Sequence, residues 1–113
     1  MLQNNHLLTR KMKILFICNQ GENRSRTAAE LWKKLHPLHQ IRYAGNNFDI
    51  GLLDWADKII VFKKTQEDEL KSIDYRYWGK SYNISIDDVY AYNSATLINI
   101  LQKKLKLIDI FES

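Results

Sequence analysis

Cys18 and Arg24 are the two residues of this chain whose types and spacing could do chemistry together. Five residues separate them, and Ser25 follows the arginine. A thiolate is a strong nucleophile, and a guanidinium can bind two phosphate oxygens at once while staying charged at any working pH. Ser25 can donate a hydrogen bond to the sulfur when the sulfur departs. The group therefore indicates nucleophilic attack on a phosphate ester.

The residues between Cys18 and Arg24 form a loop of the right size to surround a phosphate group. Their backbone N–H groups can turn inward around a tetrahedral dianion, and a helix that starts at the loop directs its positive end at the same point. A helix N-terminus and a nearby cation also favour the thiolate. The residues predicted to bind phosphate in this way are Asn19, Gln20, Gly21, Glu22 and Asn23.

A strand and a helix must hold this loop in place, and the flanking sequence predicts both. Lys13–Ile17 is an apolar run that predicts a strand, and Ser25–Leu35 predicts an amphipathic helix that stops before Pro37. The helix is expected to bury one apolar stripe, made of Ala28, Leu31, Trp32 and Leu35.

The rest of the chain alternates strand and helix patterns. Further strands are predicted at Gln40–Tyr43, Lys58–Phe62 and Ser81–Ile84. A short helix is predicted around Asp49–Trp55. A second helix is predicted to begin at Thr65, because Thr65 and Asp68 have capping-box spacing. The last helix is predicted to begin at Asn93 or Ser94 and to bury Leu97, Ile98, Leu101, Leu105 and Ile108. This order predicts an α/β fold, an open four-stranded parallel sheet with helices on both faces and the phosphate-binding loop after the first strand. Ligands of such sheets bind at the carboxyl ends of the strands, where Cys18 and the segments after Tyr43 and Ile84 should meet.

Length and composition favour one domain over residues 1–113, with 1–11 as a flexible or loosely packed N-terminal extension. The chain is 45% hydrophobic, enough for one modest core. Its single cysteine excludes an internal disulfide framework, and no apolar run approaches the roughly 18 residues that span a membrane. Residues 1–11 lack the pattern of a signal peptide. We therefore expect a reduced, cytoplasmic setting and no membrane partner.

The net charge of +4 fits attraction to phosphorylated partners, although a small lysine excess is also ordinary for solvated helix faces. Tyr75–Lys80 is the nearest thing to a basic, aromatic stripe for nucleic acid. We favour a packed connection near the rim of the site instead, so no nucleic-acid partner is expected. His6, His36 and His39 have no metal-site spacing and are expected at the surface, so the sequence predicts neither a metal site nor a cofactor.

The motifs together resemble the low-molecular-weight protein tyrosine phosphatases, especially their short bacterial branch. The resemblance covers nearly everything after residue 12, in order and spacing as well as content. Its pieces are Ile17-Cys18-Asn19-Gln20, Arg24-Ser25 with Thr27-Ala28, Tyr43-Ala44-Gly45, Trp55 to Val61, and Asp87 to Tyr92. It implies a metal-independent phosphatase in which a carboxylic acid from another loop protonates the leaving oxygen.

The family's pattern, an aspartate two residues ahead of an aromatic, selects Asp88 as this acid. Asp87 could serve if the loop were shifted by one residue, and an Asx turn that ends the fourth strand is the structural alternative. By the same resemblance, Tyr90 and Tyr92 could wall a slot for a phenolic ring, although either could be core. Phe48 is a further candidate for the opposite wall.

The function predicted from these features is phosphomonoester hydrolysis, with phosphorylated protein or a small aryl phosphate as substrate and a phosphocysteine intermediate. Cys18, Arg24, Asp88 and Ser25 would carry the chemistry. A pseudophosphatase that binds phosphate or phosphotyrosine without turnover is the alternative. It draws support from four departures from the family pattern, Gly21 for Asn, Glu22 within the loop, Arg26 for Pro and Tyr43 for Ser.

Two other classes share the position of the cysteine and are disfavoured by the sequence. Thioredoxin-coupled arsenate reductases need further cysteines to resolve their intermediate, and this chain has one. Sugar-phosphotransfer proteins with a phosphorylated cysteine do not need an arginine at the sixth position, so Arg24 argues against that class.

Overall fold

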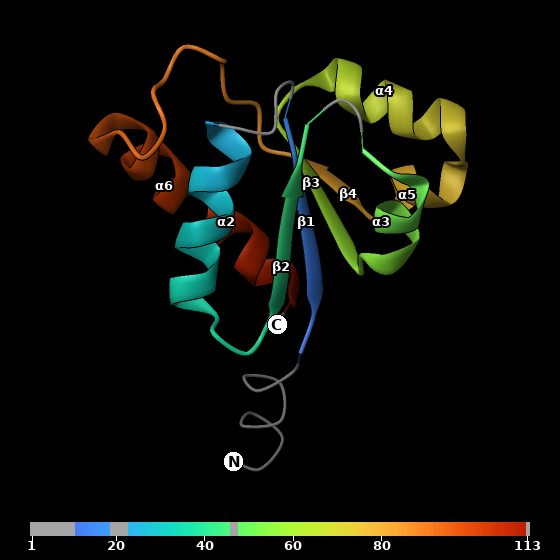
Figure 1. Cartoon of the computed structure of the whole chain (residues 1–113), viewed down its shortest axis with the longest axis horizontal. Helices are drawn as coiled ribbons and strands as arrows, with labels where there is room; N and C mark the ends of the chain where they lie inside the picture. The colour runs from blue at the N-terminus through green and yellow to red at the C-terminus, as the bar shows by residue number, and fades with distance from the viewer. Residues whose placement is uncertain (1–10, 19–22, 46–47, 113) are drawn as a thin grey trace.

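The computed structural model describes residues 11–18, 23–45 and 48–112, with the backbone alone for 107–112. Strands and helices alternate along these ranges (Figure 1). They are β1 (Lys13–Ile17), α2 (Arg24–Leu35), β2 (Gln40–Ala44), α3 (Ile50–Trp55), β3 (Lys58–Val61), α4 (Lys64–Ile73), α5 (Tyr75–Gly79), β4 (Ser81–Asn83) and α6 (Ala95–Glu112). The strands form one parallel sheet in the order β2-β1-β3-β4, so the predicted fold class is confirmed.

The apolar run of β1 is explained by burial on both faces of the sheet. Ile14 and Phe16 pack in a core that α2 and α6 cover, whereas Leu15 and Ile17 pack in a second core under α3, α4 and α5. Figure 1 shows these two helix layers on opposite sides of the strands. Successive side chains of a strand point to opposite faces, so a central parallel strand needs apolar residues at every position. Cys18 continues the even-numbered series and joins the core beneath α2.

The carboxyl ends of the strands meet at one edge of the sheet, as predicted. Ile17 is in register with Ala44 of β2 and with Val61 of β3. Beyond the strands, the Cys18 N–H donates to the Ala44 carbonyl at 3.1 Å, and the Ile86 N–H donates to the Phe62 carbonyl at 3.2 Å. A hydrogen bond therefore holds the segment that follows β4 at the same edge of the sheet as the carboxyl end of β1.

The end of α2 corrects two predictions. Leu35, expected in the buried stripe, is 52% exposed, and His39, expected at the surface, is buried. The reason is the turn after α2, which folds back so that the His39 Nδ1 accepts a hydrogen bond from Trp32 Nε1 at 3.0 Å. The ring of His36 stacks on that of His39, with centroids 5.0 Å apart. Trp32 and the two histidines thus close the core where Leu35 was expected to do so.

Truncation of Trp32 should therefore destabilise the protein far more than truncation of Leu35. Trp32→Ala removes a fully buried ring and should lower the free energy of unfolding by about 3–5 kcal/mol. Leu35→Ala removes an exposed side chain and should change it by less than about 0.5 kcal/mol. Urea denaturation of both variants measures the difference. Similar losses in the two variants would contradict the packing described for the end of α2.

The start of α4 differs from the predicted cap. The helix begins at Lys64, and Gln66 caps it, because its side-chain oxygen accepts from the N–H groups of Phe62 at 2.7 Å and Lys63 at 3.1 Å. Thr65 and Asp68 are exposed. The side chain of Gln66 is longer than those of Thr65 and Asp68, so it reaches back to the residues just after β3. This contact fixes the start of the helix one residue earlier than expected.

The segment Tyr75–Lys80 lies at the opposite edge of the sheet from Cys18, which corrects its predicted place near the rim. It forms the short helix α5, which is followed directly by the first residue of β4. Tyr77 is buried and donates to Asp54 at 2.6 Å, while Lys80 donates to the Ala56 carbonyl just before β3. At its start, hydrogen bonds from the Arg76 side chain hold the pKa of Asp74 at about 2.

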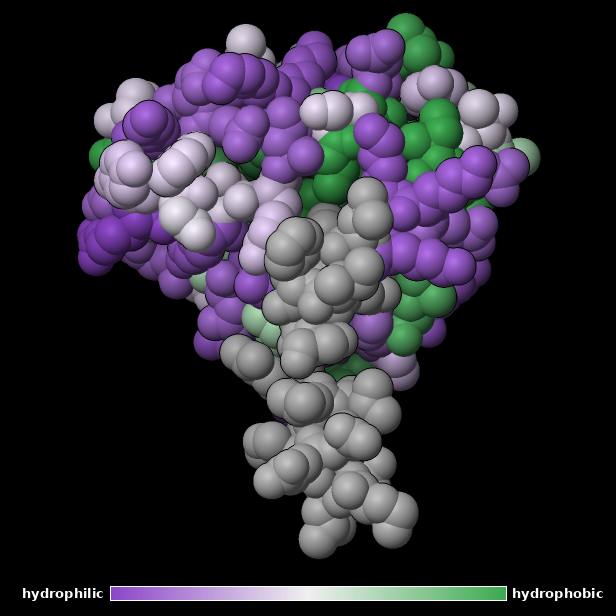
Figure 2. Space-filling view, turned by 180° about the vertical axis from the view of Figure 1, so that it is seen from behind, coloured by the Kyte–Doolittle hydropathy of each residue, from purple (hydrophilic) through white to green (hydrophobic). Residues whose placement is uncertain are grey.

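The face of the molecule drawn in Figure 2 carries mainly hydrophilic residues, and its hydrophobic residues form several separate areas. Among the described helices, none has the length and apolar character needed to cross a membrane.

Candidate active site

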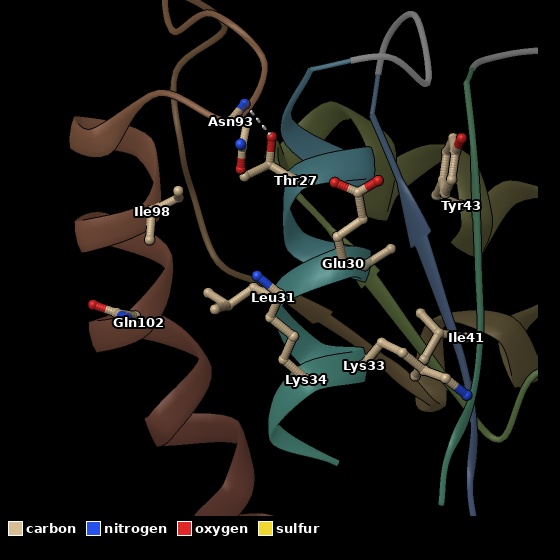
Figure 3. Close-up of a pocket in the computed structure, with 11 residues that line it drawn as sticks. Thr27, Glu30, Leu31, Lys33, Lys34, Ile41, Tyr43, Asn93, Ile98 and Gln102 are labelled. Carbon is tan, nitrogen blue, oxygen red and sulfur yellow. Dashed lines mark hydrogen bonds between the residues drawn. The ribbon is translucent and has the colours of Figure 1, made fainter. Parts of the chain in front are cut away.

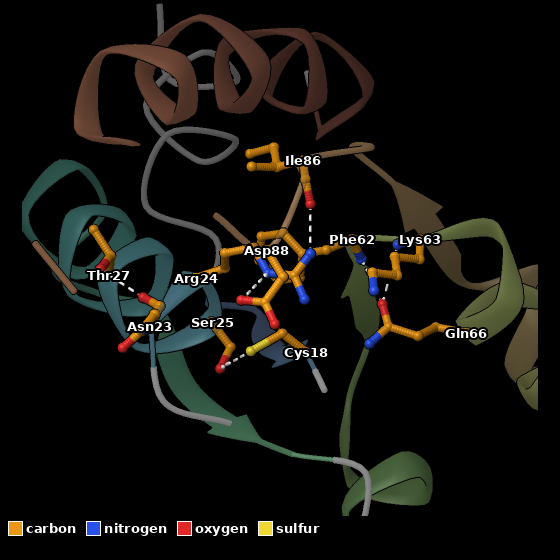
Figure 4. Close-up of polar contacts among 10 residues, drawn as sticks. All are labelled: Cys18, Asn23, Arg24, Ser25, Thr27, Phe62, Lys63, Gln66, Ile86 and Asp88. Atoms are coloured by element: carbon orange, nitrogen blue, oxygen red, sulfur yellow. Dashed lines mark hydrogen bonds and ion pairs between the residues drawn. The ribbon is translucent and has the colours of Figure 1, made fainter. Parts of the chain in front are cut away.

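Cys18 lies directly after β1, at the carboxyl edge of the sheet and beside the first turn of α2. Its thiol is buried, and the sulfur lies 3.2 Å from the hydroxyl oxygen of Ser25, which is buried as well (Figure 4). Ser25 is the second residue of α2, so the strand and the helix together set this distance. The sulfur thus has a polar hydrogen-bonding partner inside an otherwise apolar core.

Arg24 is the first residue of α2, and its guanidinium is completely buried, with 0% of the side chain exposed. Nη1 donates to the backbone carbonyl of Ile86, and the group lies 5.4 Å from the centre of the Phe62 ring. Nε lies 3.6 Å from a carboxylate oxygen of Asp88, which is an ion pair without a hydrogen bond. These contacts draw together α2, the end of β3 and the segment after β4.

Two nitrogen atoms of this buried guanidinium, Nε and Nη2, have no hydrogen-bond partner among the described residues. An unpaired buried donor costs about 1–3 kcal/mol, and more when it belongs to a charged group. An anion with several oxygens, placed between Arg24 and Cys18, would satisfy both donors and compensate the buried charge. The geometry of Arg24 therefore favours a tetrahedral oxyanion beside the thiol.

Asp88, the predicted acid, comes from the segment after β4 and forms an ion pair with Arg24. Figure 4 draws its carboxylate beside the Arg24 guanidinium, and 41% of its side chain is exposed. Asp87 is exposed too, but the ion pair to Arg24 is made by Asp88. Ser85, three residues before Asp88, has a positive φ of 47°, which turns the chain after β4. The structure thus brings Asp88 together with Arg24, Cys18 and Ser25.

The two predicted wall residues lie in different surroundings. Tyr90 is half-buried and packs against the core that contains Cys18. The hydroxyl of Tyr92 donates to Glu30 on the outer side of α2, which raises the pKa of the tyrosine, and its ring lies 4.3 Å from the guanidinium of Arg26. Phe48 packs against the core on the opposite face of the sheet. The wall role of Tyr90 and Tyr92 stays a prediction.

The predicted phosphate loop is described only at its last residue. Asn19, Gln20, Gly21 and Glu22 lie outside the described residues, and so does His6. Asn23 immediately precedes α2, and its carbonyl accepts from both the N–H and the hydroxyl of Thr27. The phosphate-binding role of all five loop residues stays a prediction.

Some neighbours of the site could not be found from their sequence. Ile86 acts through its backbone carbonyl, which every residue type has, and Phe62 is one apolar residue among many.

A pocket of about 790 Å³ lies elsewhere, on the outer side of α2, and neither Cys18 nor Arg24 lines it (Figure 3). Over the described part of the chain, no group of three or more His, Cys, Asp or Glu side chains is arranged to hold a metal ion.

The strand order and the parallel connections of the sheet define a known class of fold. The chain has the fold of the low-molecular-weight tyrosine phosphatases, as similarity to several solved bacterial structures shows. No protein-family model and no curated protein matches the sequence.

Three of the similar structures are phosphatases from different bacteria. The tyrosine phosphatase Wzb of Escherichia coli K30, solved with phosphate, aligns with a TM-score of 0.73 and 18% identity over 85% of this chain and 94% of its own. SP-PTP, a low molecular weight protein tyrosine phosphatase of Streptococcus pyogenes, aligns at 0.71 with 14% identity over 86% and 90%. The arginine phosphatase YwlE of Geobacillus stearothermophilus aligns at 0.67 with 16% identity over 89% and 90%.

Proposed function

We propose that this protein is a phosphomonoester hydrolase, specifically a cysteine-dependent tyrosine phosphatase. The observation that carries the proposal is the buried Arg24 guanidinium, which has two N–H donors without an acceptor among the described residues and precedes Ser25, whose hydroxyl oxygen lies 3.2 Å from the Cys18 sulfur. A phosphoryl group between the two residues would pair those donors and place phosphorus within reach of the sulfur. The substrate is a phosphorylated protein or a small aryl phosphate.

The reaction consists of two displacements at phosphorus. The Cys18 thiolate attacks, an S–P bond forms, the P–O bond to the leaving group breaks, and Asp88 gives its proton to the leaving oxygen. Water then attacks the phosphocysteine and passes a proton to Asp88, while the S–P bond breaks. Ser25 donates a hydrogen bond to the departing thiolate. Arg24 stabilises the charge on the equatorial oxygens in both steps, with the N–H groups of the predicted loop.

The ion pair between Arg24 and Asp88 supports the role of the aspartate. In the absence of substrate, the carboxylate lies 3.6 Å from the arginine and compensates part of its charge. A phosphoryl group bound at Arg24 would lie next to this carboxylate, which places Asp88 where it can give a proton to the leaving oxygen.

Turnover of a generic aryl phosphate tests the proposal directly. We expect release of inorganic phosphate and inhibition by vanadate. Phosphate or vanadate affinity without any product would instead establish the pseudophosphatase. Parallel assays with phosphotyrosine and phosphoarginine peptides test the substrate class, because the proteins of similar structure include both tyrosine phosphatases and an arginine phosphatase.

Replacement of Arg24 should remove both turnover and anion binding. Arg24→Ala deletes the cation that holds the phosphoryl oxygens, so kcat/KM should fall by at least roughly 10²–10³-fold. Phosphate should no longer raise the melting temperature of this variant. Arg76→Ala is the matched control, since Arg76 is an exposed arginine at the opposite edge of the sheet and should leave both properties unchanged. Unaltered vanadate inhibition of residual activity in Arg24→Ala would remove Arg24 from the anion site.

A further inference from the structure

The hydroxyl group of Thr27 joins two segments that lie far apart in the sequence. Thr27 belongs to the first turn of α2, and only 2% of it is exposed. Its Oγ1 donates to the carbonyl of Asn23 at 2.6 Å and accepts from the backbone N–H of Asn93 at 2.9 Å. Figure 4 shows the first of these bonds, and Figure 3 shows the second.

The two partners of this hydroxyl belong to the two segments that carry the proposed chemistry. Asn23 is the last residue of the predicted phosphate loop and immediately precedes Arg24. Asn93 ends the segment that carries Asp88, just before α6. Asn93 also has a positive φ of 60°, a left-handed conformation that asparagine tolerates better than most residues. The bond from its N–H to Thr27 helps to hold the chain in that conformation.

The same segment is attached to the site at its other end through Ile86. Ile86 donates its N–H to Phe62 and accepts from Arg24 at its carbonyl. Between the two attachments, Asp87, Asp88 and Val89 are exposed, and Val89 is 76% exposed, whereas Tyr90 is half-buried against the core. Burial therefore does not fix Asp88 itself, and its position depends on Tyr90 and on the two ends of the segment.

We propose that Thr27 is a positioning residue for the acid. It anchors the second end of the Asp88 segment to the helix that begins with Arg24, so that the carboxylate stays within reach of the leaving oxygen. This inference rests on the proposed function. Tyr92 also contacts α2 through Glu30 and Arg26, but those side chains are substantially exposed, whereas only 2% of Thr27 is exposed.

A purely local role for Thr27 is the competing explanation. Threonine in a helix often donates to the carbonyl four residues earlier, and the bond to Asn23 is of that kind. Such a role would affect the stability of α2 and the phosphate loop, but it would not affect proton transfer selectively. The two explanations therefore predict different dependence on the leaving group.

The test uses Thr27→Val, which removes the hydroxyl and keeps the shape. For phenyl phosphate, a poor leaving group, we expect kcat/KM to fall roughly 10- to 100-fold. For a nitrophenyl ester the loss should be less than about threefold, and phosphate affinity should be retained, because a good leaving group needs little protonation. Thr27→Ser keeps the hydroxyl and should restore most of the activity towards phenyl phosphate.

Ser94→Ala is the matched control, because it deletes another hydroxyl that accepts a backbone N–H, that of Leu97, one residue from Asn93. It should not change the leaving-group dependence. An equal loss for both esters in Thr27→Val, a loss of phosphate affinity, or the same selective loss in Ser94→Ala would overturn the proposal.

Amide hydrogen exchange makes the test independent of turnover. In Thr27→Val, exchange of the segment from residue 86 to 93 should accelerate by at least about tenfold, while β1 exchanges as in the wild type. Unchanged exchange in that segment would overturn the anchoring role even if the enzyme is active. Faster exchange in a protein without any turnover would uphold the anchor and refute the proposed function instead.

Discussion

Replacement of Cys18 by serine should abolish hydrolysis of aryl phosphates while the protein still binds phosphate. A serine hydroxyl at this position does not ionise as a thiol does, so no nucleophile is available at neutral pH. The loss of kcat should be roughly 10⁴-fold or more, the scale seen when a nucleophile is removed from a preorganised site. Arg24 is unchanged in this variant, so phosphate should still raise the melting temperature.

The single cysteine of the chain allows a complementary measurement. Alkylation of the wild type by iodoacetamide reports on Cys18 alone, and phosphate should slow it by occupying the site. Rapid quenching of the wild type should trap one phosphoryl group per chain, and Cys18→Ser should trap none on sulfur. Substantial activity in Cys18→Ser would refute the phosphocysteine mechanism.

Replacement of Asp88 by asparagine should lower the rate by roughly 10²–10⁴-fold for phenyl phosphate and by much less for a nitrophenyl ester. Asparagine keeps the shape of the side chain but cannot give a proton to the leaving oxygen. A plot of log kcat against the pKa of the leaving phenol should therefore become much steeper than in the wild type. The rate of Asp88→Asn should also lose the dependence on pH that a proton donor contributes.

Asp87→Asn provides the matched control one residue away. Adjacent side chains of an extended segment point in different directions, and the ion pair to Arg24 belongs to Asp88. Asp87→Asn should therefore keep the shallow wild-type slope. A steep slope in Asp87→Asn alone would move the acid to that residue, and shallow slopes in both variants would place the acid elsewhere.

The strand and helix around Cys18 were predictable because their signals are local. The predicted strand at Lys13–Ile17 has the bounds that the structure gives it, and α2 begins one residue before the predicted start. Apolar residues at consecutive positions indicate burial on both faces, and the sheet order then puts β1 in the middle. By contrast, α5 is too short to show a periodicity, and the capping of α4 depends on the reach of Gln66.

The sequence by itself determined the order of the strands and of every helix except α5, the parallel sheet, and the position of Cys18 after β1 and of Arg24 and Ser25 at the start of α2. These features follow from propensity, periodicity and spacing over a few residues. Only the tertiary structure decided which groups meet the first turn of α2. Arg24 meets the carbonyl of Ile86, 62 residues further on, and Thr27 meets the N–H of Asn93, 66 residues further on. Backbone groups are the same in every residue, so side-chain identities could not reveal these partners, and the crossovers of the sheet had to bring them together.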